Sequence, residues 1–250
     1  MYRILEAECD GDLYADACYD QTTPFYNMLM EALETAKEKQ YRVIPVVQLD
    51  SGAYDFYAGN ACWFNGSGIP RSVPIQGAAY IEVHGAKDGE TVLRLHGSMQ
   101  WMFFALCEGI KFMDLQIEYA DDNMLCPLSN PRGPAFYPVG VPDELDRYTM
   151  VFDRCKSISF ERVKVFGQNL SWVFSGCQDI TLRDVSGTAA ITALNCTGVL
   201  QCQNVDCSLI SRKTRDCAPL LIAPDMKMVE NAVIVPENQY EEDGKCVCHI

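Results

Sequence analysis

The chain lacks any apolar run long enough to cross a bilayer, and its beginning lacks the apolar core of a signal peptide. A membrane-spanning helix needs about 20 consecutive apolar residues, and none of the 250 residues lie in such a run. Residues 1–8 include Arg3, Glu6 and Glu8, so they do not resemble a secretory leader. We therefore expect no membrane partner and a cytoplasmic location, with secretion as the alternative.

Positive charge is also scarce, because 34 Asp and Glu residues outnumber 20 Lys and Arg residues. The resulting net charge of −14 would be repelled by a nucleic-acid backbone, so we expect no nucleic-acid partner. The chain has no Ser-His-Asp order, no phosphate-cradling glycine loop and no convincing metal-ligand set. It also lacks the Asn-Thr-Asp and Gly-His-Gly motifs of polygalacturonases. We expect neither a cofactor nor a metal.

Cysteine, by contrast, is abundant, with 13 residues. A disulfide scaffold is typical of small secreted chains without a core, and several of these cysteines instead open copies of one frame, C-x-x-I-x-F/L-x-x-L/V. The copies begin at Cys107, Cys155 and Cys177, at Cys196 with one extra residue, and in degraded form at Cys217. Their starts are 48, 22, 19 and 21 residues apart. A period near 20 that contains a short β pattern indicates a stacked solenoid.

The frame predicts a right-handed, single-stranded parallel β-helix. Ile158 and Phe160 alternate with polar neighbours, which gives one buried and one solvated face. One such segment cannot bury its own face, so it must stack on the next, about 4.8 Å away. The frame cysteines should then form a buried ladder, with Cys202 and Cys207 also in the core. Whether Cys246 and Cys248 bind a metal or form a disulfide is open.

The N-terminal part predicts a cap for this solenoid. Residues 1–20 are acidic and irregular, and Thr22-Thr23-Pro24 supplies a capping hydroxyl followed by proline in a first helical turn. An amphipathic helix over 23–39 follows, and it can cover the open end of a β-helix. We expect one domain over 1–250, with rungs over 41–235, an inserted loop over 119–149 and a tail over 236–250.

A family resemblance appears in the opening rungs. The order of Leu49-x-x-Gly52-x-Tyr54-x-Phe56, Ile81-Glu82-Val83-His84-Gly85, Val92-Leu93-Arg94-Leu95-His96-Gly97 and the Cys107 frame resembles the start of pectin-lyase-like β-helix proteins. Within that superfamily it is most similar to glycoside hydrolase family 110, the α-galactosidases. The resemblance covers roughly residues 20–119, and more loosely the repeats up to Cys207. It implies a carbohydrate-active protein that acts on a terminal galactosyl-type sugar.

Acidic residues at the junction of the repeats and the long loop are the candidate catalytic groups. Glu118, Asp121 and Asp122 lie where the loop begins, and Asp153 lies where it returns. Sugar hydrolysis needs two carboxylates about 5–9.5 Å apart, and outward residues of a β-helix can supply that spacing. We predict these residues as general acid and base; solvated acids that bind backbone amides are the structural alternative.

Several other residues are candidates either for substrate contact or for a structural role. Trp172 can stack on a sugar as an exposed indole, or it can be buried; Arg132 and Tyr137 are loop candidates for substrate contact. His84 and His96 each precede a glycine at a rung corner, and we interpret them as turn residues. One set directly precedes the last core aliphatic of each repeat, and we expect it to stack as a turn or salt-bridge column: Asp114, Arg162, Asp184 and Asn204.

The leading hypothesis is therefore a glycoside hydrolase with an oligosaccharide or polysaccharide as its partner. One alternative is a non-catalytic carbohydrate-binding or structural β-helix. A second is a polysaccharide lyase, which needs a Lys or Arg base, and Lys156, Arg162 and Lys164 are the basic residues near the repeats. The sugar, its linkage and the oligomeric state are left open.

Overall fold

The computed structural model describes residues 3–7, 21–57, 63–64, 70–96, 100–119, 149–166, 171–212, 221–222 and 227–228. Its helix is α1 (Thr22–Glu38). Its strands are β1 (Arg3–Ala7), β2 (Val43–Gln48), β3 (Gly52–Tyr57), β4 (Trp63–Phe64), β5 (Pro70–Gln76), β6 (Ala79–His84), β7 (Thr91–His96), β8 (Gln100–Ala105), β9 (Glu108–Tyr119), β10 (Met150–Asp153), β11 (Lys156–Phe166), β12 (Ser171–Ser175), β13 (Gln178–Leu194), β14 (Thr197–Arg212), β15 (Leu221–Ile222) and β16 (Lys227–Met228).

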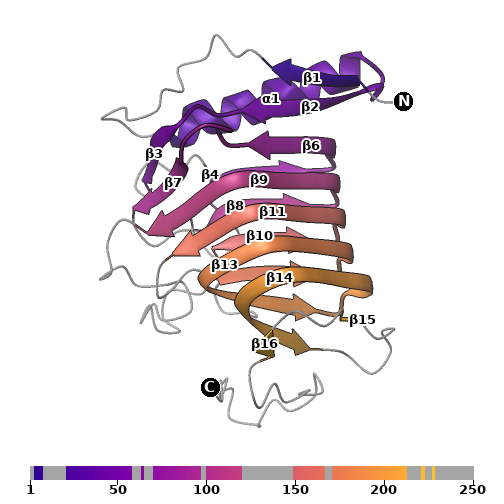
Figure 1. Cartoon of the computed structure of the whole chain (residues 1–250). Helices are drawn as coiled ribbons and strands as arrows, with labels where there is room; N and C mark the ends of the chain where they lie inside the picture. Colours follow the sequence, from indigo (N-terminus) through magenta and orange to yellow (C-terminus); the bar gives the residue numbers. More distant parts are fainter. Residues whose placement is uncertain are drawn as a thin grey trace.

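The strands coil into a solenoid with three faces, each built from parallel pairs (Figure 1). The first face stacks β1, β2 and β6 on the opening parts of β9, β11, β13 and β14. The second face stacks β3 and β7 on the following parts of β9, β11 and β13. The third face stacks β5, β8, β10 and β12 on the ends of β13 and β14. The predicted parallel β-helix is confirmed.

Four long strands pass from the first face to the second through one left-handed residue each. These residues form the column that we name the corner ladder: Asp114 (φ 59°), Arg162 (φ 51°), Asp184 (φ 53°) and Asn204 (φ 53°). Arg162 donates to both carboxylate oxygens of Asp114, at 2.6 and 2.9 Å, and Asn204 Nδ2 donates to Asp184 Oδ1 at 2.8 Å. The predicted column of turn and ion-pair residues is confirmed.

The cysteine ladder also lies where the repeat predicts it. Cys107, Cys155, Cys177 and Cys196 are buried, free thiols at the corner between the third and first faces. Each donates to carbonyl oxygens at the end of the preceding strands; for example, Cys177 Sγ lies 3.1 Å from Phe152 O. Burial raises the pKa of the Cys177 thiol, which keeps it protonated as a donor. Cys202 and Cys207 are buried and free as well, whereas Cys217, Cys246 and Cys248 lie outside the described residues.

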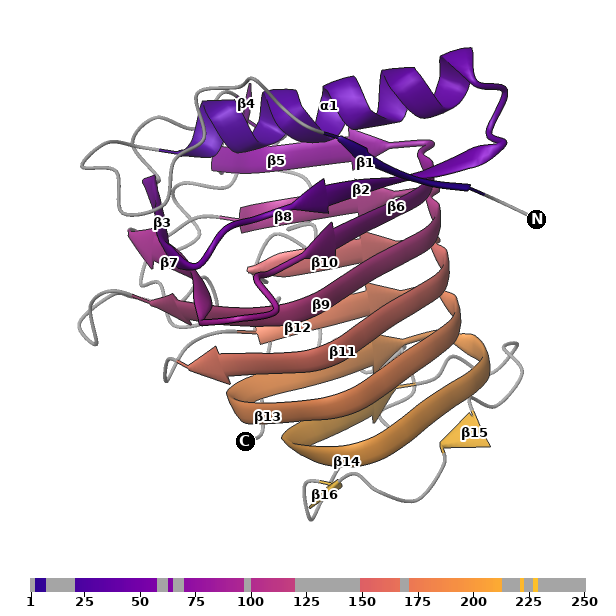
Figure 2. The ribbon, with the colours of Figure 1, turned by 45° about the horizontal axis from the view of Figure 1, so that its top comes forward.

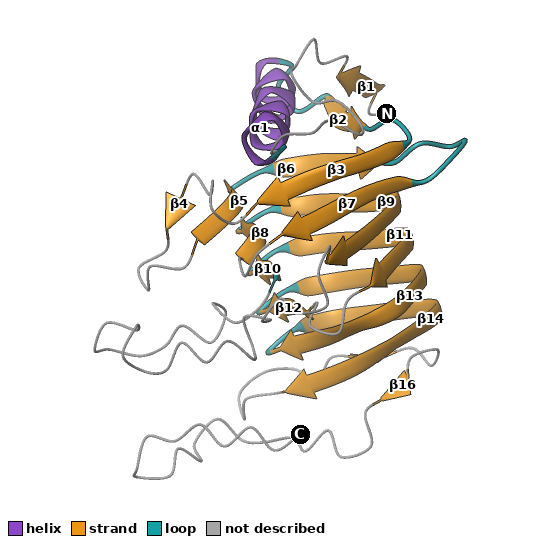
Figure 3. Ribbon diagram, turned by 90° about the vertical axis from the view of Figure 1, so that its left-hand side faces the viewer, coloured by secondary structure: helices purple, strands orange, loops and turns teal. Residues whose placement is uncertain are grey.

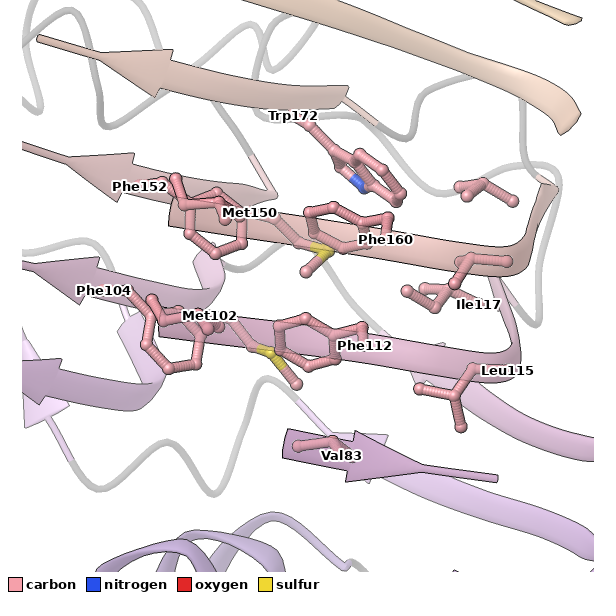
Figure 4. Close-up of a cluster of buried hydrophobic side chains, with 14 of the residues drawn as sticks. Val83, Met102, Phe104, Phe112, Leu115, Ile117, Met150, Phe152, Phe160 and Trp172 are labelled. Carbon is pink, nitrogen blue, oxygen red and sulfur yellow. The ribbon is translucent and has the colours of Figure 1, made fainter. Parts of the chain in front are cut away.

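Inside the solenoid, aromatic rings stack along the axis (Figure 4). Phe104, Phe152 and Phe174 form one column, with ring centroids 5.4 and 5.2 Å apart. A second column runs from Phe112 through Phe160, 5.2 Å away, to the indole of Trp172, 4.5 Å from Phe160. Such offset contacts add about 0.5–1.5 kcal/mol per pair to the burial of the rings. Phe104, Phe152 and Phe174 are equivalent residues on successive rungs, as are Phe112 and Phe160, whereas Trp172 reaches Phe160 from the third face.

Helix α1 covers the N-terminal end of this core (Figure 2, Figure 3). It buries Phe25, which packs 5.4 Å from Phe56 and 6.4 Å from Trp101 between ring centroids. The predicted capping helix is thus confirmed, and so is the core position of Trp101. The predicted capping hydroxyl is wrong, because Gln21 is the N-cap and no side-chain cap bond forms. Residues 1–20 are also not wholly irregular, since β1 pairs with β2.

Candidate functional site

A row of outward side chains crosses the second face of the solenoid. Asp55 of β3, Arg94 of β7, Glu118 of β9 and Phe166 of β11 are register partners on successive strands. The residues next to them in sequence are buried and point into the core: Tyr54, Phe56, Leu93, Leu95, Ile117 and Val165. We name Asp55, Arg94 and Glu118 the carboxylate row. Strand alternation alone places its charged groups on the outside.

One guanidinium group holds both carboxylates of the row. Arg94 Nε donates to Glu118 Oε1 at 2.8 Å, and Arg94 Nη1 lies 3.6 Å from Asp55 Oδ1. Gln116 Nε2 donates to the other oxygen of Glu118 at 2.9 Å. Both Glu118 oxygens therefore accept hydrogen bonds, as an ionised carboxylate does. The side chains of Asp55 and Glu118 are 18% and 22% exposed, so the pair is partly shielded but open to a ligand.

An imidazole extends the row on the side of Asp55. His96 Nε2 lies 2.6 Å from Asp55 Oδ1, and the His96 ring stacks on Tyr57 with centroids 4.2 Å apart and planes 9° apart. Asp55 and Tyr57 are on β3, and their register partners on β7 are Arg94 and His96. The second face thus brings together two carboxylates, a guanidinium, an imidazole and a phenol, which suits acid–base chemistry.

Of the four predicted catalytic acids, the structure places Glu118 in this row. Asp153 lies elsewhere, at the end of β10 on the third face, where Arg154 Nη2 binds its carboxylate at 2.9 Å. Glu118 lies in the second-face part of β9, so the solenoid does not bring these two acids together. Asp121, Asp122, Arg132 and Tyr137 lie outside the described residues, and their roles remain predictions.

Two sequence-based interpretations need correction. Trp172 has no exposed surface and packs on Phe160, so of its two predicted alternatives the buried one is correct and sugar stacking is wrong. His84 and His96 are the last residues of strands, not turn residues, and each lies 2.6 Å from a carboxylate: His84 from Glu82 and His96 from Asp55. The signal for His96 was present in the alternation of β7, which puts Arg94 and His96 on one face.

Two of the three basic residues considered for a lyase are held in structural contacts, and the third lies away from the carboxylate row. Arg162 binds Asp114 in the corner ladder, and Lys164 Nζ lies 3.4 Å from Glu90 Oε1. Lys156 is exposed on the first face, away from the carboxylate row. Within the described ranges no group of His, Cys, Asp and Glu side chains is arranged to hold a metal ion. No described helix is long and apolar enough to cross a membrane.

Comparisons with known proteins return only distant structural likenesses. No protein-family model and no curated protein match the chain. A Parabacteroides merdae protein with a provisional assignment as a glycosyl hydrolase aligns with a TM-score of 0.40 and 8% identity, over 84% of this chain and 97% of that one. The A-module of the mannuronan C-5 epimerase AlgE4 from Azotobacter vinelandii aligns with a TM-score of 0.42 and 14% identity, over 85% and 62%.

Proposed function

We propose that the protein is a carbohydrate-active enzyme, a glycoside hydrolase that removes a terminal galactosyl-type sugar by a two-carboxylate mechanism. Glu118 and Asp55 are the two carboxylates. The observation that supports this assignment is their position: both point outward on the second face, and Arg94 holds one on each side. Glycosidases use such a pair of carboxyl groups on either side of the bond that breaks.

We propose that the pair acts with inversion of the anomeric centre, which the spacing of its two strands allows. Asp55 and Glu118 lie two inter-strand steps apart, which is about 9.6 Å along the sheet. Both carboxylates contact Arg94, so their oxygens lie closer together than the strands do, with a guanidinium group between them. Inverting enzymes separate the two carboxyl groups by about 6.5–9.5 Å to admit a water molecule, whereas retaining enzymes need about 5–5.5 Å.

The hydrogen bonds suggest a role for each group. Glu118, whose two oxygens accept hydrogen bonds, acts as the general base. It accepts a proton from the water molecule that attacks the anomeric carbon. Asp55 and His96 share a hydrogen bond and act as the proton-donating unit. As the glycosidic C–O bond breaks, a proton moves from this unit to the leaving oxygen. Glu118 ends with one proton more and the Asp55–His96 unit with one proton fewer, and exchange with solvent restores both.

The proposed galactosyl specificity rests on the sequence resemblance to family 110. Residues of the predicted loop over 119–149 are proposed to contribute to the same site. Asp121 and Asp122 follow Glu118 by three and four residues in the sequence, and they remain candidate catalytic acids. Arg132 and Tyr137 lie in the predicted loop over 119–149, from which they would contact the substrate.

A non-catalytic sugar-binding protein is the second candidate, and one observation favours it. Arg94 neutralises much of the charge of both carboxylates, which would leave a polar platform that binds hydroxyl groups without activating water. The two candidates differ in turnover, not in the location of the site.

The experiment is a hydrolysis screen on a panel of α- and β-linked aryl glycosides and galactose-terminated oligosaccharides. Three proteins are compared: the unaltered chain, Glu118→Gln and Asp153→Asn. The proposal predicts turnover of a galactoside that Glu118→Gln lowers by about 10²–10⁴-fold and Asp153→Asn changes less than about twofold. Binding without turnover would support the second candidate, and loss of activity in Asp153→Asn alone would contradict the site.

A further inference from the structure

An exposed aromatic ring continues the carboxylate row. Phe166 is the register partner of Glu118 on the next strand, and 42% of its surface is exposed. Val165 beside it is fully buried, so the alternation of β11 directs the Phe166 ring outward. Gly187 of the next rung packs directly against the backbone of Val165, where a Cβ atom would overlap with its carbonyl oxygen. The backbone of Val165, directly before Phe166, is therefore packed closely against the next rung.

A second aromatic surface lies at the other end of the row. Tyr57 is 39% exposed, and its ring lies nearly parallel to that of His96, 4.2 Å away. Tyr57 of this stack is on β3 and His96 is on β7, whereas Phe166 is on β11. Three inter-strand steps, about 14 Å along the sheet, separate Tyr57 from Phe166. The charged groups of the row lie between them.

We propose that Phe166 and the Tyr57–His96 stack are two sugar-binding platforms, and that the site takes an oligosaccharide lying along the solenoid axis. This inference rests on the proposed carbohydrate specificity and adds the length and the direction of the ligand. A sugar ring has apolar C–H faces and a rim of hydroxyl groups. The two aromatic surfaces can pack against the C–H faces, and Arg94, Glu118 and Gln116 can form hydrogen bonds with the hydroxyl groups.

The length of the row argues for more than one sugar unit. A single hexose ring is shorter than the separation of about 14 Å between Tyr57 and Phe166, so it would contact one of these rings and the carboxylates but not both rings. Tyr57 and Phe166 are both exposed aromatic residues, 39% and 42% respectively. A ligand that spans both platforms covers Tyr57 and Phe166 together.

The test measures how affinity depends on the length of the sugar. In the Glu118→Gln background, which prevents turnover, calorimetric titration compares galactose with a galactose-terminated tetrasaccharide. Phe166→Leu keeps an apolar side chain but removes the ring, and Phe166→Tyr keeps the ring. Val199→Ala is the matched control, because Val199 is another exposed apolar residue, 43% exposed, and lies on the first face of β14.

The expected result is a selective loss in one variant. Phe166→Leu should weaken tetrasaccharide binding by about tenfold and galactose binding by less than about twofold, while Phe166→Tyr and Val199→Ala bind as before. Equal losses for both sugars, or no loss, would overturn the inference. Hydrolysis by the unaltered protein is measured in parallel, and its absence would contradict the proposed hydrolase without affecting the comparison of the two sugars.

Discussion

The carboxylate row and the corner ladder both pair acidic side chains with arginine, and they meet on strand β9, but they are built differently. In the ladder, Asp114 and Arg162 are paired one to one, in a bidentate contact. In the row, Asp55 and Glu118 share the single guanidinium of Arg94.

The backbone conformation explains the residue types of the corner ladder but not those of the carboxylate row. Every ladder residue has a positive φ, which Asp and Asn adopt more readily than most residues. The residues of the row are on strands with ordinary extended geometry, so nothing in the backbone requires a charge there. Outward residues that the fold does not demand are the better candidates for function, and each prediction below separates the two groups further.

The largest expected effect is the loss of activity from the row. Asp55→Asn and Glu118→Gln should each lower kcat by about 10²–10⁴-fold, and the double variant should lose little more, because the two groups serve one step. Steady-state kinetics on the best substrate measures this. Glu161→Gln is the control: Glu161 is also outward, but it lies on the first face, 3.3 Å from Lys111 and 3.8 Å from Arg183. An equal loss of kcat in Glu161→Gln would contradict the distinction between the row and the structural ion pairs.

The next effect concerns an aromatic residue inside the solenoid instead of on its surface. Trp172→Ala should lower the free energy of unfolding by about 3–5 kcal/mol, because it leaves a cavity beside Phe160. Tyr57→Ala, an exposed aromatic change, should cost less than about 1 kcal/mol. Urea denaturation followed by circular dichroism measures both, and similar values for the two variants would contradict the core position of Trp172.

A smaller effect tests the backbone explanation of the corner ladder. Arg162→Val places a β-branched residue at a φ of 51°, and it should destabilise the fold by about 1–3 kcal/mol. Arg162→Asn removes the same charge but tolerates this φ, so it should cost less than about 1 kcal/mol. The same substitution in an extended position, Arg183→Val, serves as the control. Thermal unfolding measures the stability of the three variants. Equal losses of stability in Arg162→Val and Arg162→Asn would refute the backbone explanation.

The smallest effect is electrostatic and depends on pH. Hydrogen bonds from Arg162 hold the pKa of Asp114 below its usual value of 3.8. A lowered folded-state pKa contributes stability above that value, and the contribution is lost as the pH falls through the folded pKa. Asp114→Asn should therefore cost about 0.2–1 kcal/mol at pH 7, and the difference from the unaltered protein should shrink below about pH 4. A difference that grows in acid would have the wrong sign.

The repeat determined how much of the fold could be predicted. The frame that begins at Cys107, Cys155 and Cys177 predicted the solenoid, the thiol ladder and the corner ladder, because stacked rungs put equivalent residues in one column. Strand β1 was not predicted, since it lies outside the repeat and forms only by pairing with β2. The capping hydroxyl was wrong because helix α1 begins one residue earlier than the Thr-Pro pattern indicates.

The site was predicted only in part. Glu118 lies at the end of a repeat, so the pattern pointed to it. Asp55 and His96 are 41 residues apart in the chain, and only the register of β3 with β7 brings them to 2.6 Å. These first rungs lack the cysteine frame, so the sequence carried no signal for that register. Trp172 could not be assigned to the core or the surface until β12 was placed on the third face.

The anomeric configuration of the first product is the most decisive measurement. Hydrolysis of an α-galactoside is followed by NMR at times shorter than mutarotation. The proposed role of Glu118, a general base that activates water for direct attack, predicts inversion, so β-galactose should appear first. Initial release of α-galactose would mean that a closer pair of carboxylates performs the reaction, and it would contradict the assignment of Asp55 and Glu118.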